Sequence, residues 1–265
     1  MPEIPHFVQE QARVLSNQPV AKGIYLMRLE APAVSRTCQP AQFVQILTDP
    51  GLSPFLRRPF SALRVDRDAG WFEIIYDVIG PGTERMAVAK IGDEFDINGP
   101  LGQPFVPPNT GRLLLVGGGV GLVPLAFLAW AHPERRNDMV YLMGAANGHR
   151  MPDMAALLPQ NLVLHLATDD GSVGHKGFVT QLIAEHVVPN TTVITCGPHA
   201  MMAQVAKIAG EMKLPCFASL ENHMACGFGA CMGCVVAYKE ATTPDLQYRR
   251  VCLEGPMVNA HAIVW

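Results

Sequence analysis

The pattern of hydrophobic and polar residues divides the chain into regions with different element types. Up to about residue 103, short runs rich in β-branched and aromatic residues alternate partly with polar ones, as in Ile24–Leu29, Phe43–Leu47 and Trp71–Tyr76. Gly and Pro separate these runs, which is typical of strands joined by turns. No clear helical pattern comes before Thr83. The first region therefore predicts a small antiparallel β-barrel.

From Arg112 onward, apolar runs alternate with helical patterns. Leu113–Val116 is a continuous apolar run, which is typical of a parallel strand buried on both faces. Alternating strands and helices over about a hundred residues predict a doubly wound parallel sheet. Further strands are expected at Met139–Met143, Leu162–Leu166 and Thr192–Thr195, and helices at Pro124–Trp130, Ala155–Leu158, Val179–His186 and Ala200–Met212.

A cysteine-rich stretch lies near the C-terminus. Cys226, Cys231 and Cys234 are separated by four and two residues, and Cys252 follows after seventeen more. This is the plant-type spacing for a [2Fe–2S] cluster, in which four thiolates hold two irons. The glycines between them let the chain wrap closely around an inorganic core and turn backbone N–H groups toward the sulfurs. A structural zinc site and buried free cysteines are the alternatives, although zinc usually takes two separated C-x₂-C pairs.

One weaker motif in the expected barrel begins with an arginine. Arg58 is followed by Pro59, Phe60 and Ser61. This order can place a cation on a pyrophosphate, with the Phe60 backbone against a flat ring and Ser61 donating to the edge of that ring. The alternative is an exposed arginine before a turn proline.

A second weak motif is a turn that opens an expected helix over Glu84–Lys90. Gly82 and Thr83 lie at its start, where backbone amides and a hydroxyl suit a phosphate. The alternative is a simple N-cap at Thr83. Two such motifs within one small barrel support each other.

A glycine-rich loop follows the first strand of the α/β region. Gly117, Gly119 and Gly121 stand between a strand and a helix, and Pro124 falls in the first helical turn. That context is what a dinucleotide-binding loop requires, although the spacing is G-x-G-x-x-P. A tight turn is the alternative. No acidic residue for the ribose hydroxyl follows the second strand, so the pattern does not distinguish NAD from NADP, and Arg150 is compatible with a ribose phosphate.

Another candidate site follows the last clear strand. Cys196, Gly197 and Pro198 come at its carboxyl end, where ligands bind in open α/β sheets. A thiol, a glycine and a turn proline there could flank a nicotinamide ring. A buried cysteine ahead of an ordinary turn is an equal alternative.

The composition excludes several classes of function. Of the 265 residues, 49% are hydrophobic and 16% charged, and the formal net charge is −3, so nothing indicates binding to nucleic acid. No apolar run reaches membrane-spanning length, and the first residues lack the regions of a signal peptide. Seven cysteines, four of them expected on metal, fit a reducing cytoplasm. Cys38 and Cys216 are expected to be buried or half-buried thiols.

With these motifs, the chain resembles the electron-transfer subunits of the NAD-dependent dihydroorotate dehydrogenases, which belong to the ferredoxin-reductase superfamily. The resemblance runs nearly end to end. The segments that carry it are Arg58–Ser61, Gly82–Thr83, Asn98–Gly102, Gly117–Pro124, Thr168–Ser172, His175–Thr180, Cys196–Pro198, Ser219–Glu221, the cysteine stretch and Cys252–Pro256.

The resemblance implies three modules: an FAD-binding β-barrel at 1–103, an NAD(P)-binding α/β domain at 104–216 and a [2Fe–2S] module at 217–265. The cluster would be held by Cys226, Cys231, Cys234 and Cys252. FAD would be held by Arg58, Pro59, Phe60, Ser61, Ile75, Tyr76, Asp77, Gly82 and Thr83. The nicotinamide nucleotide, NAD bound as substrate, would be held by Gly117, Gly119, Gly121, Pro124, Cys196, Gly197 and Pro198.

The resemblance also implies a partner. An FMN-containing (β/α)₈ barrel would oxidise dihydroorotate to orotate in pyrimidine biosynthesis, most simply in a cytoplasmic heterotetramer with two copies of each subunit. Electrons would pass from that FMN to the cluster, then to FAD and then to NAD⁺, so this oxidoreductase subunit needs no acid–base residue for orotate chemistry. The runner-up is a diaphorase subunit of a sulfide dehydrogenase or of an NAD(P)H:ferredoxin oxidoreductase. A third hypothesis is a zinc-bearing interaction protein.

Three positions depart from the family pattern. Asp77 stands where arginine is common, which puts that flavin contact in question. The interval before Cys252 is longer than usual around Ala241–Gln247, and a surface loop near the docking face is expected there. The loop Asn147–Arg150 is unlike the common nucleotide-specificity pattern.

Overall fold

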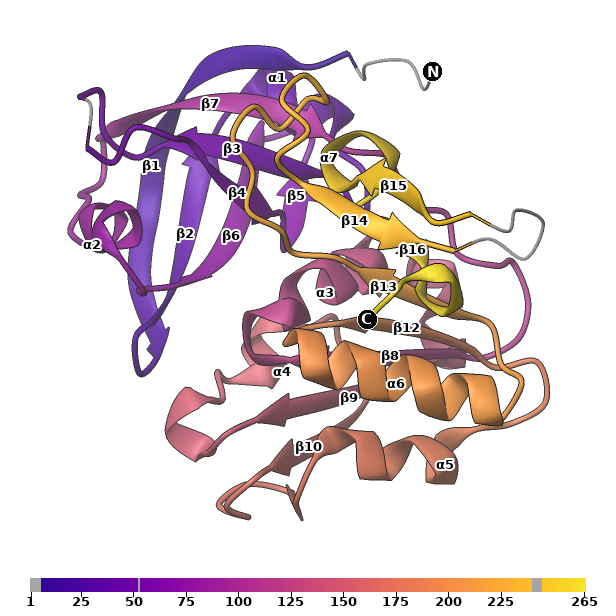
Figure 1. Ribbon diagram of the computed structural model, residues 1–265. Coiled ribbons are helices and arrows are strands. Elements are labelled where there is room, and N and C mark those ends of the chain that lie inside the picture. The colour runs from indigo at the N-terminus through magenta and orange to yellow at the C-terminus, as the bar shows by residue number, and fades with distance from the viewer. Residues whose placement is uncertain (1–5, 52, 240–244) are drawn as a thin grey trace.

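The computed structural model describes residues 6–51, 53–239 and 245–265 (Figure 1). The first region forms an antiparallel sheet that curls into a barrel, with the strand order β4-β3-β7-β1-β2-β6-β5. The expected barrel is confirmed. Its elements are β1 (Val8–Ala21), β2 (Ile24–Glu30), α1 (Pro32–Thr37), β3 (Phe43–Leu47), β4 (Arg58–Ser61), β5 (Arg64–Asp66), β6 (Trp71–Asp77), α2 (Pro81–Ala87) and β7 (Glu94–Leu101).

The expectation of no helix before Thr83 was wrong, because α1 comes earlier. This helix has only six residues and Pro32 at its start, so it shows no helical period. The first N–H groups of this helix donate to a side chain of β1. The Glu10 carboxylate accepts from Val34 N at 2.7 Å and from Ala33 N at 3.2 Å. A helix completed by a distant side chain leaves no local signal.

The second region forms a sheet in the order β11-β10-β9-β8-β12-β13-β16, in which every pairing is parallel except that of β13 with β16. Its strands are β8 (Leu113–Gly118), β9 (Met139–Ala145), β10 (Val163–Thr168), β11 (His175–Lys176), β12 (Thr192–Cys196), β13 (Cys216–Ser219) and β16 (Met257–Asn259). Its helices are η1 (Gly119–Gly121), α3 (Leu122–Ala131), η2 (Pro133–Asp138), η3 (Gly148–Arg150), α4 (Met154–Leu157), η4 (Val179–Leu182), α5 (Ile183–His186), α6 (His199–Glu211) and η5 (Ala260–Ala262).

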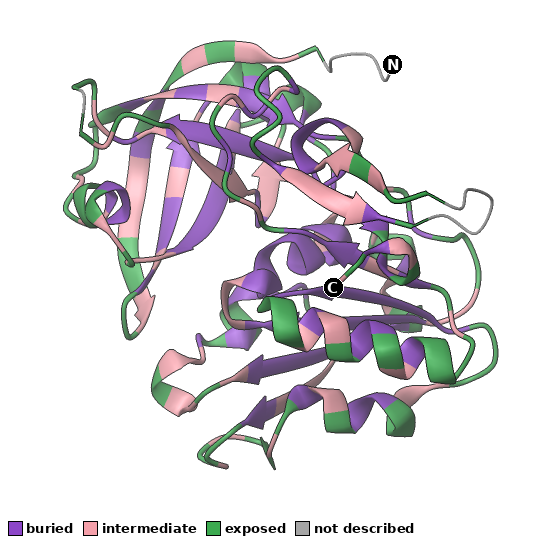
Figure 2. Cartoon of the chain, viewed as in Figure 1, coloured by how far each residue is buried: buried purple, intermediate pink, exposed green. Residues whose placement is uncertain are grey.

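Helices cover both faces of this sheet, as the doubly wound expectation required (Figure 1). Successive residues of a strand point to opposite faces. Accordingly, Leu113 and Leu115 pack in one core with α3, whereas Leu114 and Val116 pack in another with α6. The central strands are buried while the outer faces of α5 and α6 are exposed (Figure 2). None of the described helices is long and apolar enough to cross a membrane.

The C-terminal segment joins both larger units. The loop after β13 leads to β14 (Val235–Tyr238), which pairs with β15 (Gln247–Arg250), followed by α7 (Val251–Glu254). Residues 240–244, within the longer interval before Cys252, lie outside the described residues. Because β13 and β16 belong to the second sheet, this segment leaves that sheet and returns to it. The expected boundaries of the three modules stay predictions.

A polar network inside the barrel fixes α2 against β1. Asn17 of β1 donates to the carbonyls of Met86 at 2.8 Å and Ala89 at 3.3 Å. The buried Tyr76 hydroxyl donates to Asn17 Oδ1 at 2.9 Å, so the amide is oriented from both ends. Burial raises the pKa of Tyr76, and the hydroxyl stays a donor throughout the neutral range.

Tyr76→Phe is expected to lower the free energy of unfolding by about 1–3 kcal/mol, because Asn17 Oδ1 is left without its donor in the interior. Urea denaturation measures the change. Tyr25→Phe is the matched control, since Tyr25 stacks on Tyr76 with ring centroids 5.8 Å apart and is only partly buried. Equal losses in the two variants would contradict the role given to the Tyr76 hydroxyl.

Candidate functional site

The four predicted metal ligands come together as two pairs. Cys234, at the end of the loop after β13, and Cys252, in α7, are buried, and their Sγ atoms lie 3.2 Å apart. Cys226 and Cys231 lie nearer the surface, and Cys226 Sγ accepts the Cys231 N–H at 3.4 Å. Among the described residues, no three His, Cys, Asp or Glu side chains are grouped to hold a single metal ion. Two pairs of thiols match the ligand requirement of a dinuclear centre.

The loop that carries three of these cysteines depends on glycine. Gly227 has a φ of +77° and Gly229 a φ of +92°, in the left-handed region. A Cβ at Gly227 would lie 2.5 Å from Gln45 Cδ in β3, and one at Gly229 would lie 2.9 Å from Leu253 Cδ2 in α7. Both glycines are therefore required for the loop to pack between the barrel and α7.

Backbone and thiol donors around the sulfurs favour thiolates. Gly233 N lies 3.4 Å from Cys231 Sγ, and Cys252 N lies 3.4 Å from Cys234 Sγ. The hydrogen bond between the two thiols lowers the pKa of Cys234 and raises that of Cys252. Burial alone would raise the pKa of Cys226, but the N–H groups directed at its sulfur lower it overall. This donor set fits an anionic iron–sulfur centre.

The two remaining free cysteines outside the sites are ordinary buried thiols, as expected. Cys38 lies in the barrel core and Cys216 in the second sheet. Burial raises the pKa of each to about 12, so neither is a reactive thiolate.

A cavity of about 680 Å³ lies beside β4 and α2, next to the cysteine loop. Thr48 Oγ1 is buried beside it without a hydrogen-bond partner among the described residues, and a Cβ at Gly82 would lie 3.0 Å from that oxygen. A flavin nucleotide fits a cavity that is lined by a cation and has an unused hydroxyl beside a glycine. Six predicted FAD residues line it: Arg58, Pro59, Phe60, Ser61, Gly82 and Thr83.

The Thr83 hydroxyl is already engaged within its own helix. It accepts from Ile79 N at 3.0 Å and donates to the Gly80 carbonyl at 3.1 Å. The helix begins at Pro81, three residues before the expected start at Glu84. The N-cap is Gly80, so the alternative of an N-cap at Thr83 was wrong in position, although the Thr83 hydroxyl caps the helix from within its first turn.

The other three residues predicted for FAD lie elsewhere. Ile75 packs in the core shared with α3, and Tyr76 points into the barrel core. Asp77 forms an ion pair with Arg150 of the second region, to which both of its carboxylate oxygens bond, Oδ1 at 3.2 Å. Their part in FAD binding stays a prediction.

The Asp77–Arg150 ion pair connects two of the positions that depart from the family pattern. Arg150 Nη1 also donates to the Lys22 carbonyl at 2.8 Å, and Lys22 N donates to the His149 carbonyl at 2.9 Å. The hydrogen bond to Asp77 raises the pKa of Arg150. The end of the barrel is thus fastened to the loop 147–150 of the second region.

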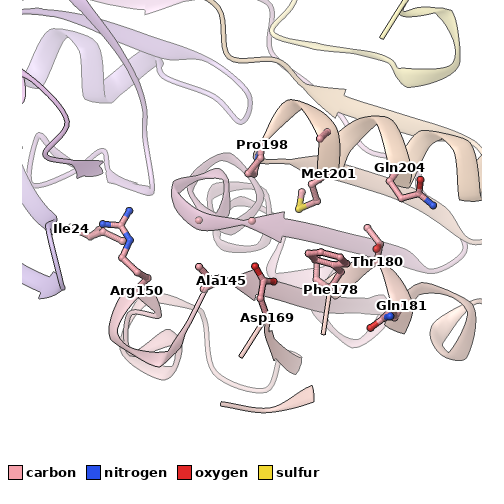
Figure 3. Close-up of a pocket in the computed structure, with 16 residues that line it drawn as sticks. Ile24, Ala145, Arg150, Asp169, Phe178, Thr180, Gln181, Pro198, Met201 and Gln204 are labelled. Carbon is pink, nitrogen blue, oxygen red and sulfur yellow. The ribbon is translucent and has the colours of Figure 1, made fainter. Parts of the chain in front are cut away.

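Another cavity, of about 790 Å³, lies at the carboxyl edge of the second sheet (Figure 3). Gly119 lines it with a φ of +56°, and a Cβ there would meet no atom within 4 Å, so this glycine leaves the space open. Arg150 and Asp169 supply its charged side chains, from separate loops (Figure 3). The cavity fits an extended dinucleotide.

Pro198 also lines this cavity, and the other predicted nucleotide residues either line a neighbouring cavity or support the loop. Gly121 and Gly197 line a cavity of about 430 Å³, together with Pro198. A Cβ at Gly121 would lie 2.4 Å from the Cys196 carbonyl oxygen, so β12 and the glycine loop pack closely. The other three predicted nucleotide residues are buried and support the glycine loop: Gly117, Pro124 and Cys196.

The three cavities adjoin one another. The middle one shares Gly119, Arg150 and Pro198 with the dinucleotide cavity, and it shares Val120 and Glu221 with the cavity beside β4. Met224, which lines the cavity beside β4, is two residues from Cys226. The thiol site, the flavin-sized cavity and the dinucleotide cavity therefore lie in that order.

Glu221 was missed as a site residue, although it ends the segment Ser219–Glu221 that carries the resemblance. It lines two cavities, and its Oε1 lies 3.9 Å from Cys196 Sγ. The side chain is exposed to the cavities but surrounded by protein atoms, and this burial raises its pKa. The place of Glu221 is visible only in the fold, where the end of β12 lies beside the chain that follows β13. Asn222 and Gln45 had no recognisable motif either, whereas Asp169 lies in the segment Thr168–Ser172 that carries the resemblance.

Glu221→Gln is expected to become more stable relative to the wild type as pH rises. Because the pKa of Glu221 is raised, the native protein binds more protons than the unfolded chain between the ordinary value of 4.5 and the raised value. Stability contributed by this group is lost as pH rises through that window, and glutamine does not titrate. Urea unfolding at a series of pH values measures the difference. A difference independent of pH would contradict the raised pKa.

Comparisons with known proteins agree with this arrangement. Residues 221–264 match the family model described as the iron-sulfur cluster binding domain of dihydroorotate dehydrogenase B. The dihydroorotate dehydrogenase B (NAD(+)) electron transfer subunit of Desulforamulus reducens is 34% identical over 257 residues, covering 96% of this chain and 97% of that protein. The subunit of the same description from Fusobacterium nucleatum is 36% identical, with 95% and 96% covered.

Solved structures show the same fold. A chain of the NADH-dependent reduced ferredoxin-NADP oxidoreductase superposes with a TM-score of 0.85 at 28% identity, covering 96% of this chain and 90% of that one. A ferredoxin NADP⁺ reductase from Neisseria gonorrhoeae with bound FAD and NADP superposes with a TM-score of 0.65 at 17% identity, covering 77% and 91%. The second likeness concerns the fold alone.

Proposed function

The chain belongs to the family of dihydroorotate dehydrogenase B electron transfer subunits, and from this premise we propose that it carries electrons from its catalytic partner to NAD⁺. The observation that supports this proposal is the order of three adjoining sites: the paired thiols, the flavin-sized cavity and the dinucleotide cavity. A one-electron centre beside a flavin beside a nicotinamide site converts single electrons into a hydride. The modules at 1–103, 104–216 and 217–265 supply most of the flavin, dinucleotide and cluster sites respectively, and residues of neighbouring modules complete the two cavities.

In this proposal, Cys226, Cys231, Cys234 and Cys252 hold the [2Fe–2S] cluster as two pairs, one for each iron. When bound, the cluster exchanges one electron at a time and FAD exchanges one or two. The N–H groups directed at the thiols stabilise their charge. The apolar packing around Cys234 and Cys252 keeps that half of the site away from water.

The barrel binds FAD through residues that line its cavity. Arg58 supplies the positive charge for the pyrophosphate, and the strand at Phe60 and Ser61 forms the wall for the flavin ring. Thr48 supplies an unused hydroxyl beside Gly82, where backbone can approach a phosphate closely. Glu221 lies where the flavin and nucleotide cavities meet, with the buried Cys196 thiol 3.9 Å from its carboxylate, so Glu221 would contact the two rings.

The dinucleotide cavity favours NAD⁺ over NADP⁺. Arg150, the cation that could have matched a ribose phosphate, is engaged by Asp77. Asp169 lines the cavity, so a carboxylate faces the bound nucleotide. A carboxylate accepts hydrogen bonds from ribose hydroxyls and repels a phosphate in their place.

The partner is the FMN-containing catalytic subunit that oxidises dihydroorotate, in a heterotetramer with two copies of each chain. The surface position of Cys231 supports docking at the cysteine loop. A cytoplasmic location is supported by the seven free cysteines of the chain.

Co-purification with the catalytic subunit, followed by addition of dihydroorotate, tests this function. The complex is expected to reduce NAD⁺. Cys231→Ser is expected to abolish that reaction and the iron–sulfur absorption while FAD stays bound and NADH still reduces ferricyanide through it. Cys38→Ser is the matched control, because that thiol is buried in the barrel core and not in the core that contains Cys234 and Cys252. Failure of the wild-type complex to reduce NAD⁺ would overturn the proposal, and loss of FAD from Cys231→Ser would contradict the division into modules.

Asp169→Asn is expected to lower the ratio of kcat/KM for NAD⁺ to kcat/KM for NADP⁺ by about tenfold, which corresponds to about 1.4 kcal/mol. The reason is that the neutral amide no longer repels a ribose phosphate. Steady-state kcat/KM with each nucleotide measures the ratio. Asp170→Asn is the matched control, because the Asp170 carboxylate bonds to Ser172 instead of lining the cavity. Equal effects of the two substitutions would exclude a specific role for Asp169.

A second candidate keeps these sites and changes the partner. The likeness to the NADH-dependent reduced ferredoxin-NADP oxidoreductase chain, with its TM-score of 0.85, supports a diaphorase subunit of that type. Mass spectrometry of the proteins that co-purify with the chain from its own cells distinguishes the two. Recovery of a dihydroorotate-oxidising FMN protein supports the first candidate, and recovery of a ferredoxin-linked or sulfide-linked subunit supports the second.

A further inference from the structure

Gln45 is a fully buried amide without a partner. Its exposed fraction is 0%, and neither Nε2 nor Oε1 has a hydrogen-bond partner among the described residues. Leaving both ends of a buried amide unsatisfied is costly, so such groups in native proteins usually meet a ligand, an ion or ordered water. Gln45 therefore indicates something that the polypeptide itself does not supply.

The side chain of Gln45 points out of the barrel and toward the cysteine loop. Val44 and Ile46, its neighbours in β3, belong to the barrel core. Phe43, two residues before Gln45 and on the same face, packs in the core that contains Cys234 and Cys252. Because alternate residues of a strand share a face, Gln45 and Phe43 face the C-terminal segment.

The loop at Gly227 rests directly on the Gln45 amide. A Cβ on Gly227 would lie 2.5 Å from Gln45 Cδ, 2.6 Å from Oε1 and 2.8 Å from Nε2. Gly227 follows Cys226, a ligand of the proposed cluster. In β4, Pro59 is the register partner of Gln45 and lines the flavin-sized cavity. The unpartnered amide thus lies between the strand that borders that cavity and the loop that carries the thiols.

We propose that the side-chain N–H of Gln45 donates to an inorganic sulfide of the [2Fe–2S] cluster beside Cys226 and raises the reduction potential of the cluster. This inference rests on the proposed function, since it requires the cluster. Reduction adds negative charge, and an N–H donor stabilises the charged form, so the donor favours the reduced cluster.

A redox titration of the chain with its cluster and FAD, followed by electron paramagnetic resonance, tests this role. Gln45→Met keeps the volume and removes the donor. We expect it to lower the equilibrium constant for reduction of the cluster by about tenfold. For a one-electron couple this lowers the reduction potential by about 59 mV. The potential of FAD, measured in the same sample, is expected to stay unchanged. Gln45→His, which keeps an N–H donor, is expected to restore most of the lost potential.

The matched control is Gln42→Met. Gln42 is also buried, but its Nε2 donates to the Gly102 carbonyl at 2.9 Å and its Oε1 accepts from Gln39 N at 3.0 Å. Its substitution is expected to lower stability and leave the cluster potential unchanged. An unchanged potential in Gln45→Met, or an equal change in Gln42→Met, would overturn the inference.

A second measurement on the wild-type chain does not depend on the folding of any variant. With ¹⁵N in the glutamine side chains, pulsed electron paramagnetic resonance of the reduced cluster is expected to detect a coupled amide nitrogen. Absence of that coupling would overturn the inference in favour of an internal pairing of Gln45 with Asn98, its register partner in β7, whose Oδ1 is also buried without a partner. A wild-type chain that takes up no cluster would instead refute the proposed function.

Discussion

The burial of Cys234 and Cys252 beside each other constrains the whole C-terminal segment. Their sulfur atoms lie 3.2 Å apart in a core that also contains Phe43 and Leu101 of the barrel and Val258 of the second sheet. Two buried thiols with N–H groups directed at them are poorly suited to a site without metal. The N–H groups favour the thiolate form, and a buried thiolate is costly without a counter-charge. A metal centre at this position joins the packing of all three parts of the chain.

The order of the sites follows from this packing. The loop after β13 must pass across β3 to reach its paired cysteines, and Gly227 and Gly229 let it do so against Gln45 and Leu253. The same passage brings Glu221 and Met224 to the wall of the flavin-sized cavity. The adjoining positions of the thiol site and the cavities therefore come from the path of the backbone.

Local patterns predicted the parts of the structure that depend on nearby residues. The cysteine spacing, the glycine loop after Leu113–Val116 and the alternation of β and α elements each reflect contacts within one motif, and the two-sheet fold followed from them. The helix α1 was missed because the cap at its start comes from Glu10, on another strand. The ion pair of Asp77 with Arg150 joins residues 73 positions apart, so each looked like an isolated departure. The roles of Glu221 and Gln45 depend on the surfaces that the fold brings against them, so no local pattern indicated these residues.

The measurement that tests the central claim most directly is chemical analysis of the chain isolated without oxygen, combined with its absorption spectrum. A [2Fe–2S] flavoprotein contains two irons and two acid-labile sulfides per FAD, and its visible spectrum shows flavin bands with iron–sulfur shoulders. The account predicts that composition and spectrum. A colourless protein that contains zinc, or one free of labile sulfide after reconstitution with iron and sulfide, would contradict it.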